Sequence, residues 1–157
     1  MYKLIIFDLD GTLAESKQPL ASEMAILVAK LLTVTRVAVV SGGAFSQFLK
    51  QVVAQLPVDA NLLHLYLLPT SGAALYEYHS PASFGIGDGT WHKVYEERLS
   101  EKEAATIETA MREVAKETGL IDFSKSVYGE RIEYRGGQVT LSALGQHAPL
   151  AEKKKWD

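Results

Sequence analysis

The sequence predicts an α/β protein with a three-layer, Rossmann-like core followed by a second α/β unit. Over residues 4–68, three short apolar runs alternate with segments of helical spacing, and polar or glycine-containing turns separate them. Strands that alternate with helices are typical of a mostly parallel sheet. Beyond residue 80 the order changes to one long helix followed by two extended runs. This change indicates a separate unit.

The core elements are expected in the order strand, helix, strand, helix, strand. Residues 4–7 are a continuous apolar run of the kind found in buried parallel strands. Residues 35–40, which are apolar from Val37 on, are the second predicted strand, and residues 65–68 are a third. Between the strands, apolar side chains recur at helical spacing and define two helix faces. The first face consists of Leu20, Met24, Leu27, Val28 and Leu31, and the second of Phe45, Phe48, Leu49, Val52, Val53 and Leu56.

The second unit is expected to contain a helix and a β-hairpin. Ser100 and Glu103 form a capping-box pattern ahead of a helix over residues 101–118, and Gly119 is a stop signal. Residues 127–134 and 138–144 are predicted strands around a glycine turn. Residues 79–90 are rich in Ser, Pro and Gly, as is typical of a boundary. We therefore expect domains at 1–80 and 81–157.

Composition is typical of a globular protein and excludes few functions. The chain has 157 residues, of which 47% are hydrophobic and 22% charged, with a net charge of −3. That charge gives no reason to expect a nucleic acid or an anionic membrane as partner. The absence of cysteine excludes disulfides and thiolate metal sites. No apolar run is long enough to span a bilayer and no signal-peptide pattern is present, so a cytoplasmic location is expected.

Two acidic residues follow the first predicted strand. Asp is disfavoured in strands, and a buried carboxylate needs a partner or a metal ion. Because side chains alternate along a strand, Asp8 and Asp10 are expected on the same side of the chain, ahead of a tight turn at Gly11. The carboxyl end of a parallel strand is also where open α/β sheets bind ligands. The alternative is an Asp-Gly turn with no further role.

A second polar turn follows the next strand. Ser41 and Gly42 stand between the predicted strand at 35–40 and the predicted helix, an arrangement that offers a hydroxyl and backbone N–H groups to an anion. Ser41 could instead simply cap the helix. Taken with Asp8 and Asp10 at the end of the preceding strand, the turn predicts a phosphate site.

Residues 8–13, with the pattern D-x-D-G-T-L directly behind an apolar strand, resemble the opening motif of the haloacid dehalogenase (HAD) superfamily. Most members transfer phosphoryl groups. The resemblance implies that Asp8 is the nucleophile and Asp10 the general acid/base, and that both help to hold Mg²⁺. Ser41 is similar to the second HAD motif. Thr12, Ser41 and Gly42 are the implied phosphate-binding residues.

The second unit resembles the cap of the phosphomannomutase branch, a large α/β insertion after the third core strand. Residues 133–146 are similar to that branch's E-F-R-N-G hairpin and S-P-I-G-R segment. The resemblance implies that Arg135 contacts a sugar phosphate, which suits a guanidinium; the alternative is a solvated turn residue. Other substrate-binding arginines of this branch correspond in position to Lys17, Gln146 and Lys153. Because Gln is uncharged, hydrolysis is favoured over mutase chemistry.

Two late HAD features have no counterpart in the sequence. No lysine follows a core strand as in the third motif, since Lys153, Lys154 and Lys155 lie in a polar segment. Residues 87–89 read Gly-Asp-Gly but lack the second acid of the family's G-D-G-x-x-D motif, so we interpret them as a turn. We infer a chain that lacks a C-terminal portion, with an incomplete cap, and expect poor or no catalysis by these 157 residues alone.

The predicted function is Mg²⁺-dependent phosphoryl transfer through an aspartyl-phosphate, with hydrolysis of a hexose phosphate as the favoured reaction. A phosphomannomutase or phosphohexomutase is the alternative, and a catalytically incomplete HAD-like binding protein is the second. A flavodoxin-like receiver domain would also carry a phosphorylated Asp, but it would not explain Asp10 together with Thr12. The expected partner is a small phosphorylated metabolite, with a homodimer through the cap as a candidate assembly.

Overall fold

The computed structural model describes residues 3–80 and 89–156. Contacts divide the chain into two compact units, Met1–Glu96 and Glu97–Asp157, which we call the core unit and the cap unit. The predicted turn at residues 87–89 lies almost wholly outside the described residues, because only Gly89 is among them.

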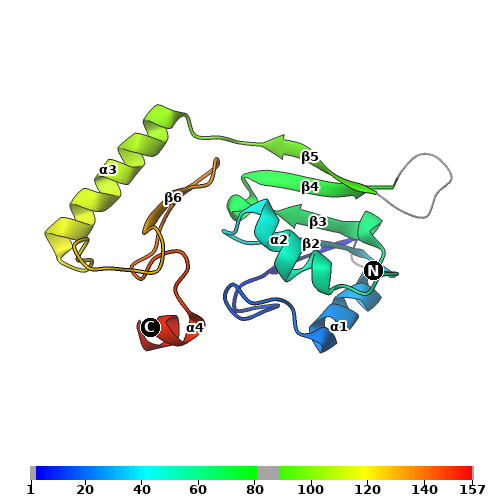
Figure 1. Ribbon diagram of the computed structural model, residues 1–157. Helices are drawn as coiled ribbons and strands as arrows, with labels where there is room; N and C mark the ends of the chain where they lie inside the picture. Colours follow the sequence, from blue (N-terminus) through cyan, green and yellow to red (C-terminus); the bar gives the residue numbers. More distant parts are fainter. Residues whose placement is uncertain (1–2, 81–88, 157) are drawn as a thin grey trace. The chain divides into compact units, whose positions relative to one another are not determined.

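The core unit is built on a five-stranded sheet in the order β1-β2-β3-β4-β5 (Figure 1). The strands are β1 (Leu4–Asp8), β2 (Arg36–Val40), β3 (Leu65–Leu68), β4 (Ala74–His79) and β5 (Thr90–Glu96). The first three are parallel, β4 is antiparallel to β3, and β5 is antiparallel to β4. Every strand except β4 therefore runs in one direction, which confirms the mostly parallel α/β core predicted from the sequence.

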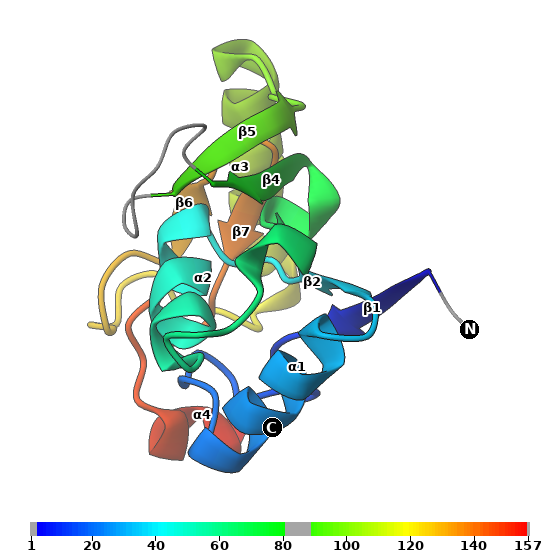
Figure 2. The same cartoon turned by 90° about the vertical axis from the view of Figure 1, so that its right-hand side faces the viewer.

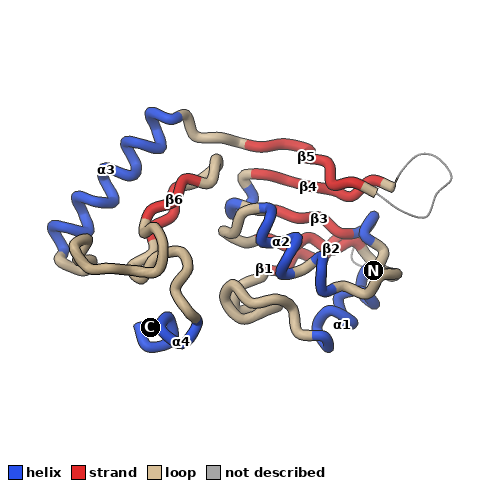
Figure 3. The backbone as a smooth tube through the Cα atoms, in the orientation of Figure 1, coloured by secondary structure: helices blue, strands red, loops and turns tan. Residues whose placement is uncertain are grey.

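Two helices cover one face of this sheet. They are α1 (Ser22–Leu32) and α2 (Phe45–Gln51), and both lie on the same side of the strands (Figures 2 and 3). Alternate residues of β2 and β3 point toward them, because side chains alternate along a strand. Leu9, Leu32, Val37, Val39, Phe48, Val52, Leu65 and Leu67 are fully buried in this layer. The ends of β1 and β2 are thus anchored by a close-packed apolar core.

The other face of the sheet differs from the prediction of a buried first strand and a three-layer core. Leu4 is 44% exposed and Ile6 is 61% exposed. Together with Ala38, Tyr66 and Leu68 they line an apolar groove of about 330 Å³. Among the described residues no helix covers this groove, because both α1 and α2 pack on the opposite side. An apolar run predicts a strand but not how many of its faces are covered.

The first helix uses most of the predicted face. Leu20, which precedes the helix, is buried, Met24 and Leu31 pack against the core, and only Leu27 is exposed. The buried residues of α1 are Ala25, Val28 and Leu32. The second predicted helix is shorter than expected, since α2 ends at Gln51 and a 3₁₀ turn occupies Val53–Gln55.

The cap unit contains α3 (Glu101–Thr118), β6 (Ile132–Tyr134), β7 (Val139–Leu141) and α4 (Leu150–Trp156). The capping box is present: the Ser100 hydroxyl accepts from the Glu103 N–H (3.2 Å), and the Glu103 carboxylate accepts from the Ser100 N–H (2.8 Å). Gly119 ends the helix in the left-handed conformation. The antiparallel hairpin is confirmed, but its strands are shorter than the predicted 127–134 and 138–144.

Candidate active site

Asp10 and Ser41 meet where the first two strands of the core unit end. The Ser41 hydroxyl donates a hydrogen bond of 2.7 Å to Asp10 Oδ2. The two residues are 31 positions apart in the chain, and the parallel pairing of β1 with β2 brings them together. Ser41 is buried, and its hydroxyl also accepts from the N–H of Gly43 (3.1 Å). One of the predicted acids and the predicted phosphate-binding serine therefore share one site.

Asp8 lies at the last position of β1 and is exposed. Its Oδ2 accepts a hydrogen bond of 3.0 Å from the Thr12 hydroxyl. The turn between them is closed by the Gly11 N–H, which donates to the Ala14 carbonyl (2.7 Å), and Gly11 adopts φ +86°. Only glycine adopts that conformation without strain. The D-x-D-G-T pattern thus folds into one tight turn that presents the Asp8 carboxylate to solvent.

Lys17 contributes to the site through its main chain. Its N–H donates a hydrogen bond of 2.6 Å to Asp10 Oδ1, and its φ is +58°. Such a conformation costs a non-glycine residue roughly 1 kcal/mol or more. Both oxygens of Asp10 therefore have fixed donors, one from Ser41 and one from Lys17. The sequence pattern predicted a substrate-binding side chain at Lys17, and the hydrogen bond from its N–H to Asp10 is a feature that the pattern missed.

A strained turn lies against the Ser41–Gly43 segment. Thr70, Ser71 and Gly72 all have positive φ values, of 51°, 58° and 88°. The Thr70 N–H donates to the Gly43 carbonyl (3.0 Å), and the Ser71 N–H donates to the Ser41 carbonyl (2.9 Å). Backbone strain of this kind tends to gather at functional sites, where the surrounding structure holds it. No periodicity in the sequence signals this turn as a support for the site.

The predicted anion site at the start of α2 is arranged differently from the prediction. The N-cap is Ala44, so Ser41 precedes the helix instead of capping it. The Ala44 N–H is taken by the Gln47 side-chain oxygen (2.9 Å). Gly42 lies in the loop between Ser41 and this cap. The loop itself, and not the helix terminus, carries the groups that could hold a phosphate.

A hollow of about 600 Å³ adjoins the motif turn. It is lined by Gly11 and Thr12 together with residues of the following loop, among them Glu15 and Gln18. Within the part of the chain that the structure describes, no group of three or more His, Asp or Glu side chains is arranged to hold a metal ion.

The predicted substrate residues of the cap unit form a separate cluster. Arg135 donates from Nε and Nη2 to Glu133 Oε2 (2.9 and 2.6 Å), and from Nη2 to Gln146 Oε1 (3.0 Å). The Arg135 side chain is only 8% exposed, and Gln146 is buried. Lys153 lies in α4. The structure thus joins Arg135 with Gln146 inside the cap unit.

Comparison with solved structures gives the fold and little more. One match is the Plasmodium falciparum IMP-nucleotidase, with a TM-score of 0.59 and 18% identity over 87% of this chain and 38% of that chain. An N-terminally truncated, IMP-bound form of the same enzyme has a TM-score of 0.59 and 15% identity over 98% of this chain and 44% of that chain. The chain thus spans about two fifths of these structures. No protein-family model and no curated protein matches the sequence.

This likeness confirms the fold predicted from the sequence, an α/β core with a mostly parallel sheet. Within the described residues, no helix is both long and apolar enough to span a membrane.

Proposed function

We propose that this chain carries the nucleophile-bearing part of a HAD-type phosphatase that hydrolyses a small phosphate ester through an aspartyl-phosphate. The observation that supports the proposal most is the 2.7 Å hydrogen bond between Ser41 and Asp10, beside the exposed Asp8 carboxylate. It brings the Asp10 carboxylate and the Ser41 hydroxyl together near the end of β1, where Asp8 lies, as the proposed acid/base and nucleophile roles require. The HAD-type fold is the second support.

The donor set fits a Mg²⁺ ion. Mg²⁺ is commonly held by one or two carboxylates, with water and substrate phosphate as the other ligands. Asp8 Oδ2 accepts from Thr12, and no hydrogen bond to Asp8 Oδ1 occurs within residues 3–80 and 89–156. Asp8 through its carboxylate and Asp10 through its main-chain carbonyl would hold the ion. When bound, Mg²⁺ would neutralise charge on the phosphate and so assist attack by an anionic carboxylate.

The chemical steps follow from the roles of the two acids. An Asp8 oxygen attacks phosphorus, the ester P–O bond breaks, and Asp10 gives its proton to the leaving alkoxide. In the second step Asp10 takes a proton from water, the water oxygen attacks phosphorus, and the Asp8 carboxylate is released with inorganic phosphate. The Ser41 hydroxyl can donate to ionised Asp10 and accept from protonated Asp10, so it suits both states.

Two substrate classes merit direct comparison. A hexose phosphate is proposed from the cap residues Arg135, Gln146 and Lys153 and from Lys17, with a phosphohexomutase as the alternative reaction. A nucleoside monophosphate is the second candidate, because the solved structures of similar fold are described as an IMP-nucleotidase, one of them with IMP bound. We further propose a cytoplasmic location and a homodimer through the cap unit.

A phosphate-release screen tests the proposal. Hexose 1-phosphates, hexose 6-phosphates and IMP would each be incubated with and without Mg²⁺, and phosphorylated Asp8 would be sought by mass spectrometry after rapid quenching. We expect slow, Mg²⁺-dependent release, because within residues 3–80 and 89–156 no third acid or histidine joins Asp8 and Asp10 in an arrangement that could hold a metal ion. Asp8→Asn should lower it at least about 10³-fold.

Release that survives Asp8→Asn, or that needs no metal, would contradict the mechanism. Isomerisation of a hexose phosphate without free phosphate would favour the mutase. Ester binding with neither release nor a phosphorylated Asp8 would favour the non-catalytic binding protein.

A further inference from the structure

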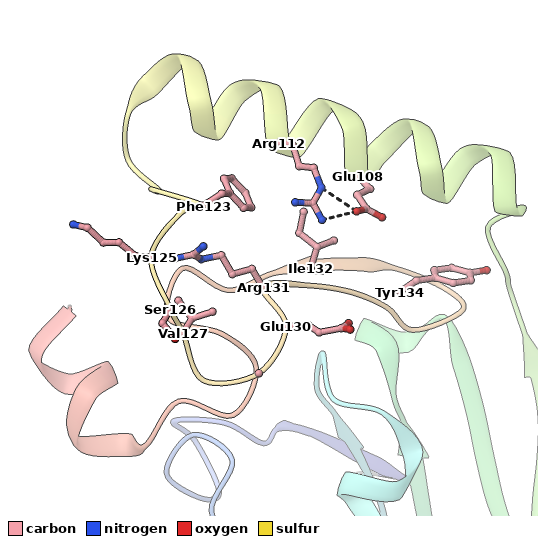
Figure 4. A pocket seen from close by; sticks show the side chains of 11 residues that line it. Glu108, Arg112, Phe123, Lys125, Ser126, Val127, Glu130, Arg131, Ile132 and Tyr134 are labelled. Atoms are coloured by element: carbon pink, nitrogen blue, oxygen red, sulfur yellow. Dashed lines mark hydrogen bonds and ion pairs between the residues drawn. The ribbon is translucent and has the colours of Figure 1, made fainter.

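The cap unit contains a cleft that the proposed phosphatase site does not use. It has a volume of about 670 Å³ and lies between α3 and the segment that leads into and through β6 (Figure 4). Its lining includes Glu108 and Arg112 from the helix, Phe123 and Lys125 from the loop after it, and Glu130 and Arg131 ahead of the strand. All of these residues belong to one compact unit, so the cleft does not depend on how the two units are arranged.

Three cations from three parts of the cap unit reach this cleft. The Arg112 guanidinium and the Arg131 guanidinium each lie 5.3 Å from the centre of the Phe123 ring. The two groups are therefore no farther apart than twice that distance. In Figure 4 the Arg131 guanidinium lies below the Phe123 ring, near the start of the Lys125 side chain, whose ammonium points away from the ring. Arg112 approaches the ring from the helix. Like charges gathered in this way raise each other's energy unless an anion offsets them.

Much of this positive charge has no acidic partner at ion-pair distance. Arg131 donates through Nε to the Ala143 carbonyl (3.2 Å), which is a neutral acceptor. Within the described part of the chain, neither Arg131 nor Lys125 forms an ion pair with a carboxylate. Arg112 is paired, since its Nε and Nη2 both donate to Glu108 Oε1 (3.0 and 2.7 Å). That pair is largely exposed and therefore weak.

Two further acids lie near the cleft and oppose anion binding. Asp122 accepts from the hydroxyl and the N–H of Ser124 (2.6 and 3.0 Å). These two hydrogen bonds, and after them the charges of Lys125 and Arg131, lower the pKa of Asp122. Glu130 points toward the opposite end of the cleft from Lys125 (Figure 4). Glu130 therefore lies away from Lys125, whereas Asp122, which does not line the cleft, offsets part of the charge of Lys125 and Arg131.

The cleft is distinct from the predicted substrate cluster. Ile132 and Tyr134 line it, and they alternate along β6 with Glu133, which pairs with Arg135. Because successive side chains of a strand point to opposite faces, Glu133 points away from the face of β6 that lines the cleft, and neither Arg135 nor Gln146 is among the residues that line it. A ligand in the cleft would not be the phosphate ester held by Arg135.

We propose that this cleft binds a small multivalent oxyanion, one whose phosphate or carboxylate groups are spaced to reach Arg131, Lys125 and Arg112 together. Guanidinium groups match the geometry of both kinds of oxyanion, and the ammonium of Lys125 adds a point charge. The Phe123 ring holds the two guanidiniums in place before the ligand arrives, which lowers the entropic cost of binding. Glu108 competes with the ligand for Arg112.

Isothermal titration of the full chain with tripolyphosphate, and separately with citrate, tests the proposal. A chelator excludes divalent metal, so that the Asp8 site contributes little. Arg131→Met and Lys125→Met should each weaken binding about tenfold. Glu108→Gln should strengthen it several-fold, because it frees Arg112. Lys102→Met removes an exposed charge of the same sign from the same helix but outside the cleft, and we expect no change.

The two probes distinguish the two kinds of ligand that the cleft could bind. Tighter binding of tripolyphosphate indicates a phosphorylated ligand, and tighter binding of citrate indicates a polycarboxylate. Circular dichroism of each variant shows whether the cap unit is folded, and the Glu108→Gln gain cannot result from misfolding. The proposal is overturned if the wild-type chain binds neither probe, if Lys102→Met weakens binding as much as Arg131→Met, or if Glu108→Gln weakens it.

Discussion

The core unit and the cap unit are both α/β, but different interactions hold them together. In the core unit, eight large side chains that include Phe48 and Leu65 are fully buried between the sheet and its two helices. In the cap unit the buried apolar residues are few and mostly small: Ala104, Ala115, Ile132 and Ala148. Polar contacts take a larger part there, such as the buried Arg135 with Glu133 and Gln146.

This difference in packing determines how rigidly each unit can hold polar groups. A close-packed apolar layer makes the strand ends rigid, so the core unit can hold Asp10 and Ser41 at a fixed distance. The cap unit has a short hairpin and depends on hydrogen bonds that must all be satisfied. We therefore expect the core unit to lose most stability when a buried apolar side chain is removed, and the cap unit when a buried hydrogen bond is removed.

The largest expected effect on stability is that of Phe48→Ala in the core unit. Phe48 is fully buried, and its removal leaves a cavity between α2 and the sheet. We expect the free energy of unfolding to fall by about 3–5 kcal/mol, measured by urea denaturation. Val58→Ala is the matched control, because Val58 is fully exposed and should change stability by less than about 0.5 kcal/mol. Similar losses for the two variants would contradict the packed core.

A smaller effect is expected for Arg135→Met in the cap unit. The change leaves Glu133 and the buried Gln146 without a charged donor, and we expect a loss of about 2 kcal/mol. Arg112→Met removes an exposed ion pair and should cost less than about 1 kcal/mol. Chemical denaturation followed by near-ultraviolet circular dichroism measures both. Equal losses would show that burial of Arg135 does not strengthen its contacts.

Ser41→Ala tests the junction of the two strand ends. It removes the hydrogen bonds that Ser41 makes with Asp10 and with the Gly43 N–H, and we expect a loss of about 1–2 kcal/mol. Phosphate release should fall as well, because Asp10 loses one of its two fixed donors. Ser41→Thr keeps the hydroxyl and serves as the comparison. Unchanged release in Ser41→Ala, with stability lowered, would limit Ser41 to a structural role.

The smallest effect concerns the cap of α3. Ser100→Ala removes the hydroxyl half of the capping box, while the N–H of residue 100 can still donate to Glu103, and should cost about 1 kcal/mol. The hydrogen bonds from the Ser100 N–H and hydroxyl lower the pKa of Glu103 below its ordinary 4.5. The contribution of these hydrogen bonds to the free energy of unfolding is therefore complete above pH 4.5 and is lost as the pH falls through the lowered pKa of Glu103. When the free energy of unfolding is measured as a function of pH, it should fall less at acidic pH in Ser100→Ala than in the wild type.

Local sequence patterns determined several features of this protein. The D-x-D-G-T turn at residues 8–12, the three parallel strands and α3 with its capping box follow from signals within a few residues of each other. Such signals act through backbone sterics and nearby hydrogen bonds, so they can be recognised in the sequence without knowledge of the tertiary structure. The mostly parallel α/β core was predictable for the same reason.

Only the tertiary structure decided which groups meet. It brought Asp10 to Ser41 and to the Lys17 N–H, and set the strained turn at Thr70–Gly72 against the Ser41 loop. It also left one face of β1 exposed and put Arg112 and Arg131 on one ring. These are contacts between residues far apart in the chain, and they depend on strand register and packing direction, which periodicity does not encode.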